Sequence, residues 1–109
     1  MSAVNMLALT EDFLRERDRV VARLNGATQR HWVSSAAAAH ACSQALRDID
    51  LALGAPGPRD VPVIADHAAG AQVMVISTDL MRTARHHHDG APSLARATDL
   101  LADLRRALA

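Results

Sequence analysis

One apolar repeat constrains the fold of this chain more than any other feature. Apolar and small residues recur alternately three and four positions apart between residues 28 and 53: Trp32, Ser35, Ala39, Cys42, Leu46, Ile49 and Leu53. This spacing places them along one stripe of a helix, as at the a and d positions of a coiled coil. A second seam of the same kind follows near the C-terminus: Leu94, Ala97, Leu101, Leu104 and Leu108. Both seams need partner helices, so the sequence predicts helices packed side by side.

Start and stop signals divide the chain into four predicted helices, at about residues 6–25, 28–53, 60–87 and 93–108. The first carries Thr10 as a possible N-cap, although its periodicity runs back to Met6. Gly26 is predicted to end this helix in a left-handed conformation, and Thr28 to cap the next one. The short connection predicts an antiparallel hairpin of the first two helices.

The third predicted helix begins with Asp60 as its cap and Pro62 in its first turn. Its sequence "AQVMVISTDLM" is apolar on nearly every face, so we expect it to be the most buried helix. A β-strand at "QVMVIS" is the alternative, but no partner strand is evident. The predicted fold is therefore all-α, an antiparallel four-helix bundle with short loops in one domain of residues 1–109. The regular seams leave room for a dimer.

The composition excludes several classes of function. All twelve basic residues are arginine, so the chain has no lysine for a P-loop or for a Schiff base with a cofactor, and no cofactor is expected. The formal net charge is zero, which gives no general attraction to nucleic acid or to anionic lipid. We expect no signal peptide and no membrane span, and hence a cytoplasmic protein. The bias to alanine and arginine suggests a bacterial genome of high GC content.

Two polar residues fall on stripes that are otherwise apolar. Arg17 lies in the middle of the apolar face of the first helix, so it should pair with a carboxylate, reach the rim of the bundle or bind an anionic ligand. The candidate partners are Asp48, Asp50 and Asp66. His67 lies on a stripe of the third helix, where a hydrogen-bonded core histidine and a functional acid or base are the two interpretations. Cys42, on the second-helix seam, is predicted to be an inert core residue.

The run "RTARHHHDGAP", residues 82–92, holds half of the histidines. In one interpretation Gly90 and Pro92 separate the third and fourth helices, and the basic residues face the negative end of the helix dipole. In another the segment is an extended loop, in which His86 and His88 point to one side and, with Asp89, bind a transition metal weakly. The segment "ARHHHDG" followed by Leu94 also resembles the phosphoacceptor box of sensor histidine kinases. That resemblance implies a continuous helix and phosphorylation of His88.

These observations predict a small non-catalytic protein that acts by protein–protein contact, as a regulatory or accessory module, with itself or another protein as the partner. The alternative is a binder of a small molecule or anion, or a small enzyme, which uses the bundle interior around Arg17 and His67.

Overall fold

The fold is an all-α bundle of four helices, as the seams predict. A computed structural model describes residues 3–26 and 32–108. Its elements in chain order are α1 (Ala3–Asn25), α2 (Trp32–Ala52), the 3-10 helix η2 (Asp66–Ala68), α3 (Ala69–Arg85) and α4 (Gly90–Ala107). No strand occurs within these two ranges, so the strand alternative at "QVMVIS" is wrong. No helix among the described residues is both long and apolar enough to cross a membrane.

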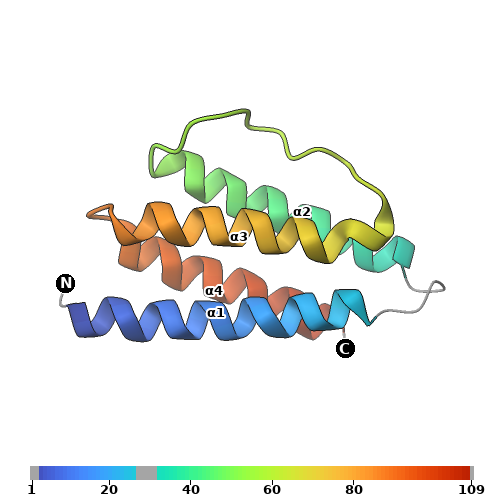
Figure 1. Ribbon diagram of the computed structural model, residues 1–109, viewed down its shortest axis with the longest axis horizontal. Coiled ribbons are helices and arrows are strands. Elements are labelled where there is room, and N and C mark those ends of the chain that lie inside the picture. The colour runs from blue at the N-terminus through green and yellow to red at the C-terminus, as the bar shows by residue number, and fades with distance from the viewer. Residues whose placement is uncertain (1–2, 27–31, 109) are drawn as a thin grey trace.

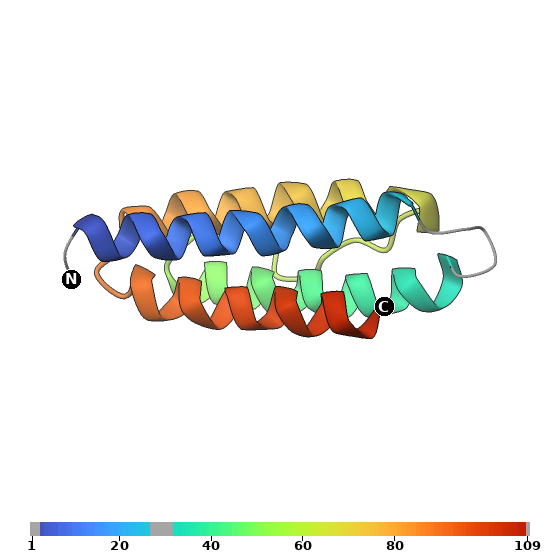
Figure 2. The same cartoon turned by 90° about the horizontal axis from the view of Figure 1, so that it is seen from below.

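The directions of the helices differ from a simple up-and-down bundle. α1 and α4 run one way and α2 and α3 run the other way (Figure 1). α1 packs against α3 and α4, and α2 packs against the same two helices, so that α1 and α2 lie diagonally opposite each other (Figure 2). The predicted hairpin of the first two helices is therefore wrong as a packed pair. The connection from α2 to α3 runs back beside α2 instead of forming a short loop, so that α3 runs parallel to α2.

The two seams form the core, as predicted. The buried seam residues are Ala39, Cys42, Leu46 and Ile49 in α2, Leu53 directly after it, and Leu94, Ala97, Leu101 and Leu104 in α4. Phe13, Val20 and Leu24 of α1 complete this core from the other side. Phe13, Leu46 and Leu101 have no exposed surface, and truncating such a side chain to alanine costs roughly 2–5 kcal/mol of folding free energy. The side chain of Trp32 lies outside the described residues.

The third helix begins later than the sequence suggests. α3 starts at Ala69, preceded by the short 3-10 helix η2, and residues 61–65 are not helical. Asp60 therefore caps no helix, and Pro62 lies in no first turn. A proline disfavours the helical conformation in the residue before it, and that residue, Val61, is buried against other parts of the chain. Contacts of this segment with residues distant in the sequence therefore outweigh the helix-start signal at Asp60.

α3 is not buried on all sides either. Its buried face consists of Ala69, Gly70, Val73, Ser77, Leu80 and Ala84. Val75, in the middle of the same apolar run, is 59% exposed. This helix therefore carries apolar side chains that do not take part in the core of the chain.

Residues 54–65, here called the strap, are held to α2 by side chains. Arg47 donates to the carbonyl oxygens of Pro56 (2.7 Å) and Pro58 (3.1 Å). Gln44 bonds Arg59 through its amide nitrogen and accepts the N–H of Val61 at 2.9 Å. Polar backbone groups that have no secondary structure of their own need such partners. The strap is thus a fixed element, and its two positive-φ residues, Gly54 and Gly57, make the turns at its start.

Two predicted caps at the ends of the first helix are wrong. α1 extends back to Ala3, so Thr10 lies inside the helix and its hydroxyl donates to the carbonyl of Met6 at 2.7 Å. Gly26 does not adopt a left-handed conformation, because its φ angle is not positive; its N–H donates to the carbonyl of Ala22. The predicted cap at Thr28 lies outside the described residues.

Candidate functional site

The histidine run forms the turn between α3 and α4. α3 ends at Arg85, His86 is its C-cap residue, and α4 begins at Gly90, three residues earlier than predicted. The N–H of His87 donates to the carbonyl of Ala84, and the N–H of Gly90 donates to the carbonyl of His87. The interpretation of the run as a helix end is therefore confirmed. The continuous helix implied by the phosphoacceptor resemblance is absent, since His88 lies in the turn.

Gly90 allows this turn to close tightly. A Cβ atom at position 90 would lie 2.7 Å from the carbonyl carbon of Ala84 and closer still to its oxygen. Real Cβ atoms do not approach backbone atoms to this extent, so only glycine fits without a shift of the backbone. The close approach fixes the start of α4 against the end of α3.

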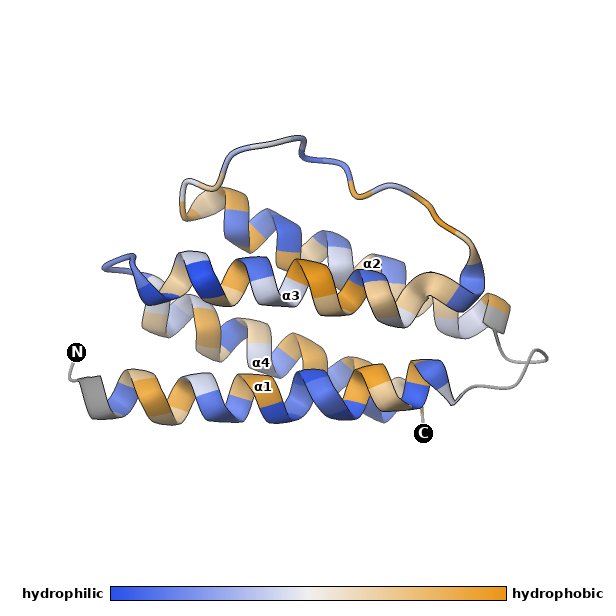
Figure 3. Ribbon diagram, viewed as in Figure 1, coloured by the Kyte–Doolittle hydropathy of each residue, from blue (hydrophilic) through white to orange (hydrophobic). Residues whose placement is uncertain are grey.

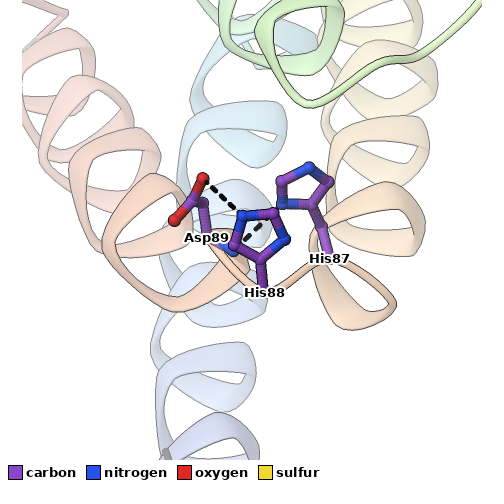
Figure 4. A group of neighbouring side chains, drawn as sticks. All are labelled: His87, His88 and Asp89. Carbon is purple, nitrogen blue, oxygen red and sulfur yellow. Dashed lines mark hydrogen bonds and ion pairs between the residues drawn. The ribbon is translucent and has the colours of Figure 1, made fainter.

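Within this turn, three potential metal ligands come together. One ligand atom each from His87, His88 and Asp89 lies within 4.8 Å of the other two (Figure 4). The Nε2 atom of His88 is 3.2 Å from Oδ2 of Asp89, and the two imidazole rings stack with their centroids 4.4 Å apart. The sequence-based set named His86 in place of His87. The alternation it assumed holds for an extended loop, whereas the backbone here forms a tight turn.

Arg17 reaches polar groups at the edge of the α1–α3 contact. Its side chain is 16% exposed, donates to the carboxylate of Asp18 (2.8 Å) and bonds the hydroxyl of Thr78 on α3 at 3.3 Å. The prediction that Arg17 pairs with Asp48, Asp50 or Asp66 is wrong. The carboxylate adjacent in sequence is closer, because an arginine at the rim of a stripe can turn back toward solvent.

His67 is not a core residue. It lies in η2 and is exposed, since the 3-10 helix has no buried residue. It precedes Thr78 by 11 residues, about 16 Å along a helix, so it is not near the position of Arg17. The structure therefore does not bring Arg17 and His67 together in the bundle interior. The prediction failed because it placed residue 67 in a regular helix.

Cys42 occupies the core position that the seam predicts. Burial, with a further contribution from the negative charge of Asp103, raises the pKa of its thiol from 9.0 to about 11. A thiol with a raised pKa stays protonated and is a poor nucleophile at neutral pH. This cysteine is a packing residue.

Sequence reasoning missed two charged pairs. Arg105 of α4 bonds Glu16 of α1 at 2.8 Å, which links two parallel helices. Arg47 of α2 pairs with Asp50 at 3.3 Å, and the carboxylate of Asp50 is only 3% exposed. The spacing of Arg47 and Asp50, three residues apart on one helix, was the available signal.

No family model, no curated protein and no solved structure matches the chain.

Proposed function

We propose that this chain is a non-catalytic helical module that acts by protein–protein contact, with a second copy of itself as the partner. The observation that carries the proposal is the exposure of four apolar residues on the end of the strap and the first half of α3: Val63, Ile64, Ala71 and Val75, here called the 63–75 surface. Val63 is 86% exposed, Val75 59% and Ile64 38%. Grouped apolar side chains in water are typical of contact surfaces.

The strap and α3 hold this surface together. The side-chain amide of Gln72 donates to the carbonyl of Pro62 at 2.8 Å, next to Val63. Ala71 and Val75 lie one turn apart on the exposed side of α3, in the half of the helix that follows the strap. Figure 3 shows the hydrophobic colouring on the end of the strap and on the first half of α3, whereas the second half of α3 is more hydrophilic.

The predicted seams do not provide the contact. Their residues in α2 and α4 are buried within the chain itself, so an interface between copies must use the outer surface. The zero formal charge supports self-association, because two copies do not repel each other over long range. A two-fold axis through the 63–75 surface would bring each Val75 against the same patch of its partner.

The alternative function in the bundle interior lacks the geometry that it assumed. Arg17 is already bonded to Asp18 and Thr78, and His67 is exposed. We further propose a regulatory or accessory role in the cytoplasm of a bacterium with a high-GC genome. The composition rich in alanine and arginine supports the source.

Sedimentation velocity of the untagged chain over a wide concentration range tests the proposal. We expect a reversible dimer that Val75→Lys weakens at least about tenfold, because a charge would be buried in the interface. Leu7→Lys is the matched control. Leu7 is also exposed, at 60%, but lies near the start of α1, at the other end of the bundle from the 63–75 surface.

A wild-type chain that stays monomeric at all concentrations would refute self-association. Equal weakening by Leu7→Lys and Val75→Lys would show that the contact does not use the 63–75 surface. Both lysines occupy exposed helical positions, where lysine is a good helix former, so the variants should fold.

A further inference from the structure

We propose that the turn between α3 and α4 is a surface site for a divalent transition-metal ion, of the class of Zn²⁺, Ni²⁺ and Cu²⁺, with His87, His88 and Asp89 as its protein ligands. Two imidazoles and one carboxylate are ligands that these ions prefer, whereas Mg²⁺ and Ca²⁺ prefer sites made of oxygen alone. The site lies at the opposite end of α3 from the 63–75 surface and is independent of the proposed function.

The separation of the ligand atoms fits one ion. Two ligands about 2.1 Å from a tetrahedral metal lie about 3.4 Å from each other. His88 Nε2 and Asp89 Oδ2 are 3.2 Å apart, which is already close to this edge length. All three ligand atoms lie within 4.8 Å of one another, so His87 has to move inward by at most about 1.4 Å. Rotation of exposed or half-buried side chains can supply such a shift.

The backbone under the three ligands is fixed by the folded bundle. The N–H of Gly90 is bonded to the carbonyl of His87, and the N–H of Ser93 to that of Asp89. Gly90 packs directly against the backbone of Ala84, which further restrains the turn. A ligand set held in place loses less conformational freedom on binding than the same residues in an open chain.

His87 gives the site a specific signature. Its Nδ1 atom accepts a hydrogen bond from the backbone N–H of Asp89 at 3.0 Å. A metal at Nδ1 takes the lone pair that this bond uses. A metal at Nε2 moves the ring proton to Nδ1, which then cannot accept. Either mode breaks the bond, so metal binding must change the environment of the Asp89 amide.

The exposure of the site sets its strength. The side chains of His88 and Asp89 are 84% and 64% exposed, and water has to fill the remaining coordination positions. Together with the loss of the Asp89 hydrogen bond, this points to a dissociation constant on the order of 10 µM, not to a permanent structural metal.

Calorimetric titration of the untagged chain with Zn²⁺ alone tests the site, because a polyhistidine tag would add a competing one. We expect one ion per chain and at least about tenfold weaker binding in His87→Gln, His88→Gln and Asp89→Asn. His86→Gln is the matched control: it removes a neighbouring histidine that lies outside the group, and binding should stay within about twofold. Thermal unfolding of each variant shows that the fold is retained.

Nuclear magnetic resonance distinguishes metal binding at this site from a non-specific effect of added charge, because it reports the chemical shift of a single amide. On addition of Zn²⁺, the amide of Asp89 should shift strongly, and the same shift should be absent in His87→Gln. The proposal is overturned if the wild-type chain does not bind Zn²⁺. It is equally overturned if His86→Gln weakens binding as much as His88→Gln, or if binding persists when all three ligands are replaced.

Discussion

Replacing Gly90 with alanine should destabilise the protein, although alanine is the better helix former. By propensity alone, glycine to alanine within a helix gains up to about 1 kcal/mol. At position 90 the added Cβ would lie 2.7 Å from the carbonyl carbon and 3.1 Å from the Cα of Ala84. These are backbone atoms, so the turn itself must open. Forcing extra atoms into a packed position costs about 1–3 kcal/mol.

Opening the turn also weakens the hydrogen bonds that close it. The bonds from His87 N–H to Ala84 and from Gly90 N–H to His87 are each worth about 1 kcal/mol. After the gain in propensity is subtracted, we expect Gly90→Ala to lower the free energy of unfolding by about 2–4 kcal/mol. For a chain of this size, that corresponds to a fall in Tm of about 10 °C or more.

Gly70→Ala is the matched control, because Gly70 also lies in the first turn of a helix. Its Cβ would meet the side chain of Asn25, with the Cγ atom 3.2 Å away, and not backbone. Asn25 is exposed and can turn aside, so Gly70→Ala should leave stability unchanged or raise it by up to about 1 kcal/mol. Urea unfolding followed by circular dichroism, at one fixed protein concentration, measures both. If Gly90→Ala proved as stable as Gly70→Ala, the steric reasoning would be refuted.

Two further predictions concern the interior. Arg47→Met should lower the free energy of unfolding by about 2–4 kcal/mol, because it leaves the carboxylate of Asp50, 3% exposed, without its charge partner and releases the strap. Arg17 is buried to the same extent, but its partner Asp18 is 62% exposed, so Arg17→Met should cost less than about 1 kcal/mol. Equal losses for the two variants in urea unfolding would contradict this account. Cys42 should resist thiol reagents until the chain unfolds. Folding raises the pKa of this thiol from 9.0 to about 11. The contribution of Cys42 to the free energy of unfolding should therefore be present below pH 9.0 and be lost as the pH rises toward about 11. Unfolding measured across this pH range should show this loss in the wild-type chain and not in Cys42→Ala.

Local periodicity predicted the parts of this fold that depend on neighbouring residues. The seams of α2 and α4 became the core because a three-four spacing selects one face of a helix wherever the partner lies. The helix end in the histidine run was predicted from Gly90 and Pro92, although both residues lie in the first turn of α4 and the turn itself is residues 86–89. The structure groups His87, and not His86, with His88 and Asp89, because which side chains converge depends on the shape of the turn. That shape follows from the contact between Gly90 and Ala84.

The direction of α3 could not be predicted from local signals, because it is decided by a register between two distant segments. His40, Gln44 and Arg47 form a polar stripe on α2, and they meet strap carbonyls between Pro56 and Val61. The seven residues from His40 to Arg47 rise about 10.5 Å along a helix. Their acceptors Val61 and Pro58 are three residues apart in a part of the strap that is not helical and bends at residues 59 and 60.

The strap runs opposite to α2 and so places its carbonyl acceptors beside this stripe. The strap ends near the N-terminal end of α2, and α3 starts there and runs parallel to α2. The spacing of four and three residues made this polar stripe visible in the sequence. The sequence did not show which acceptors its side chains would bind, because these belong to the strap. In this protein, polar side chains of α2 that bind the backbone of the strap act together with the apolar seams to hold α2 and α3 in this arrangement.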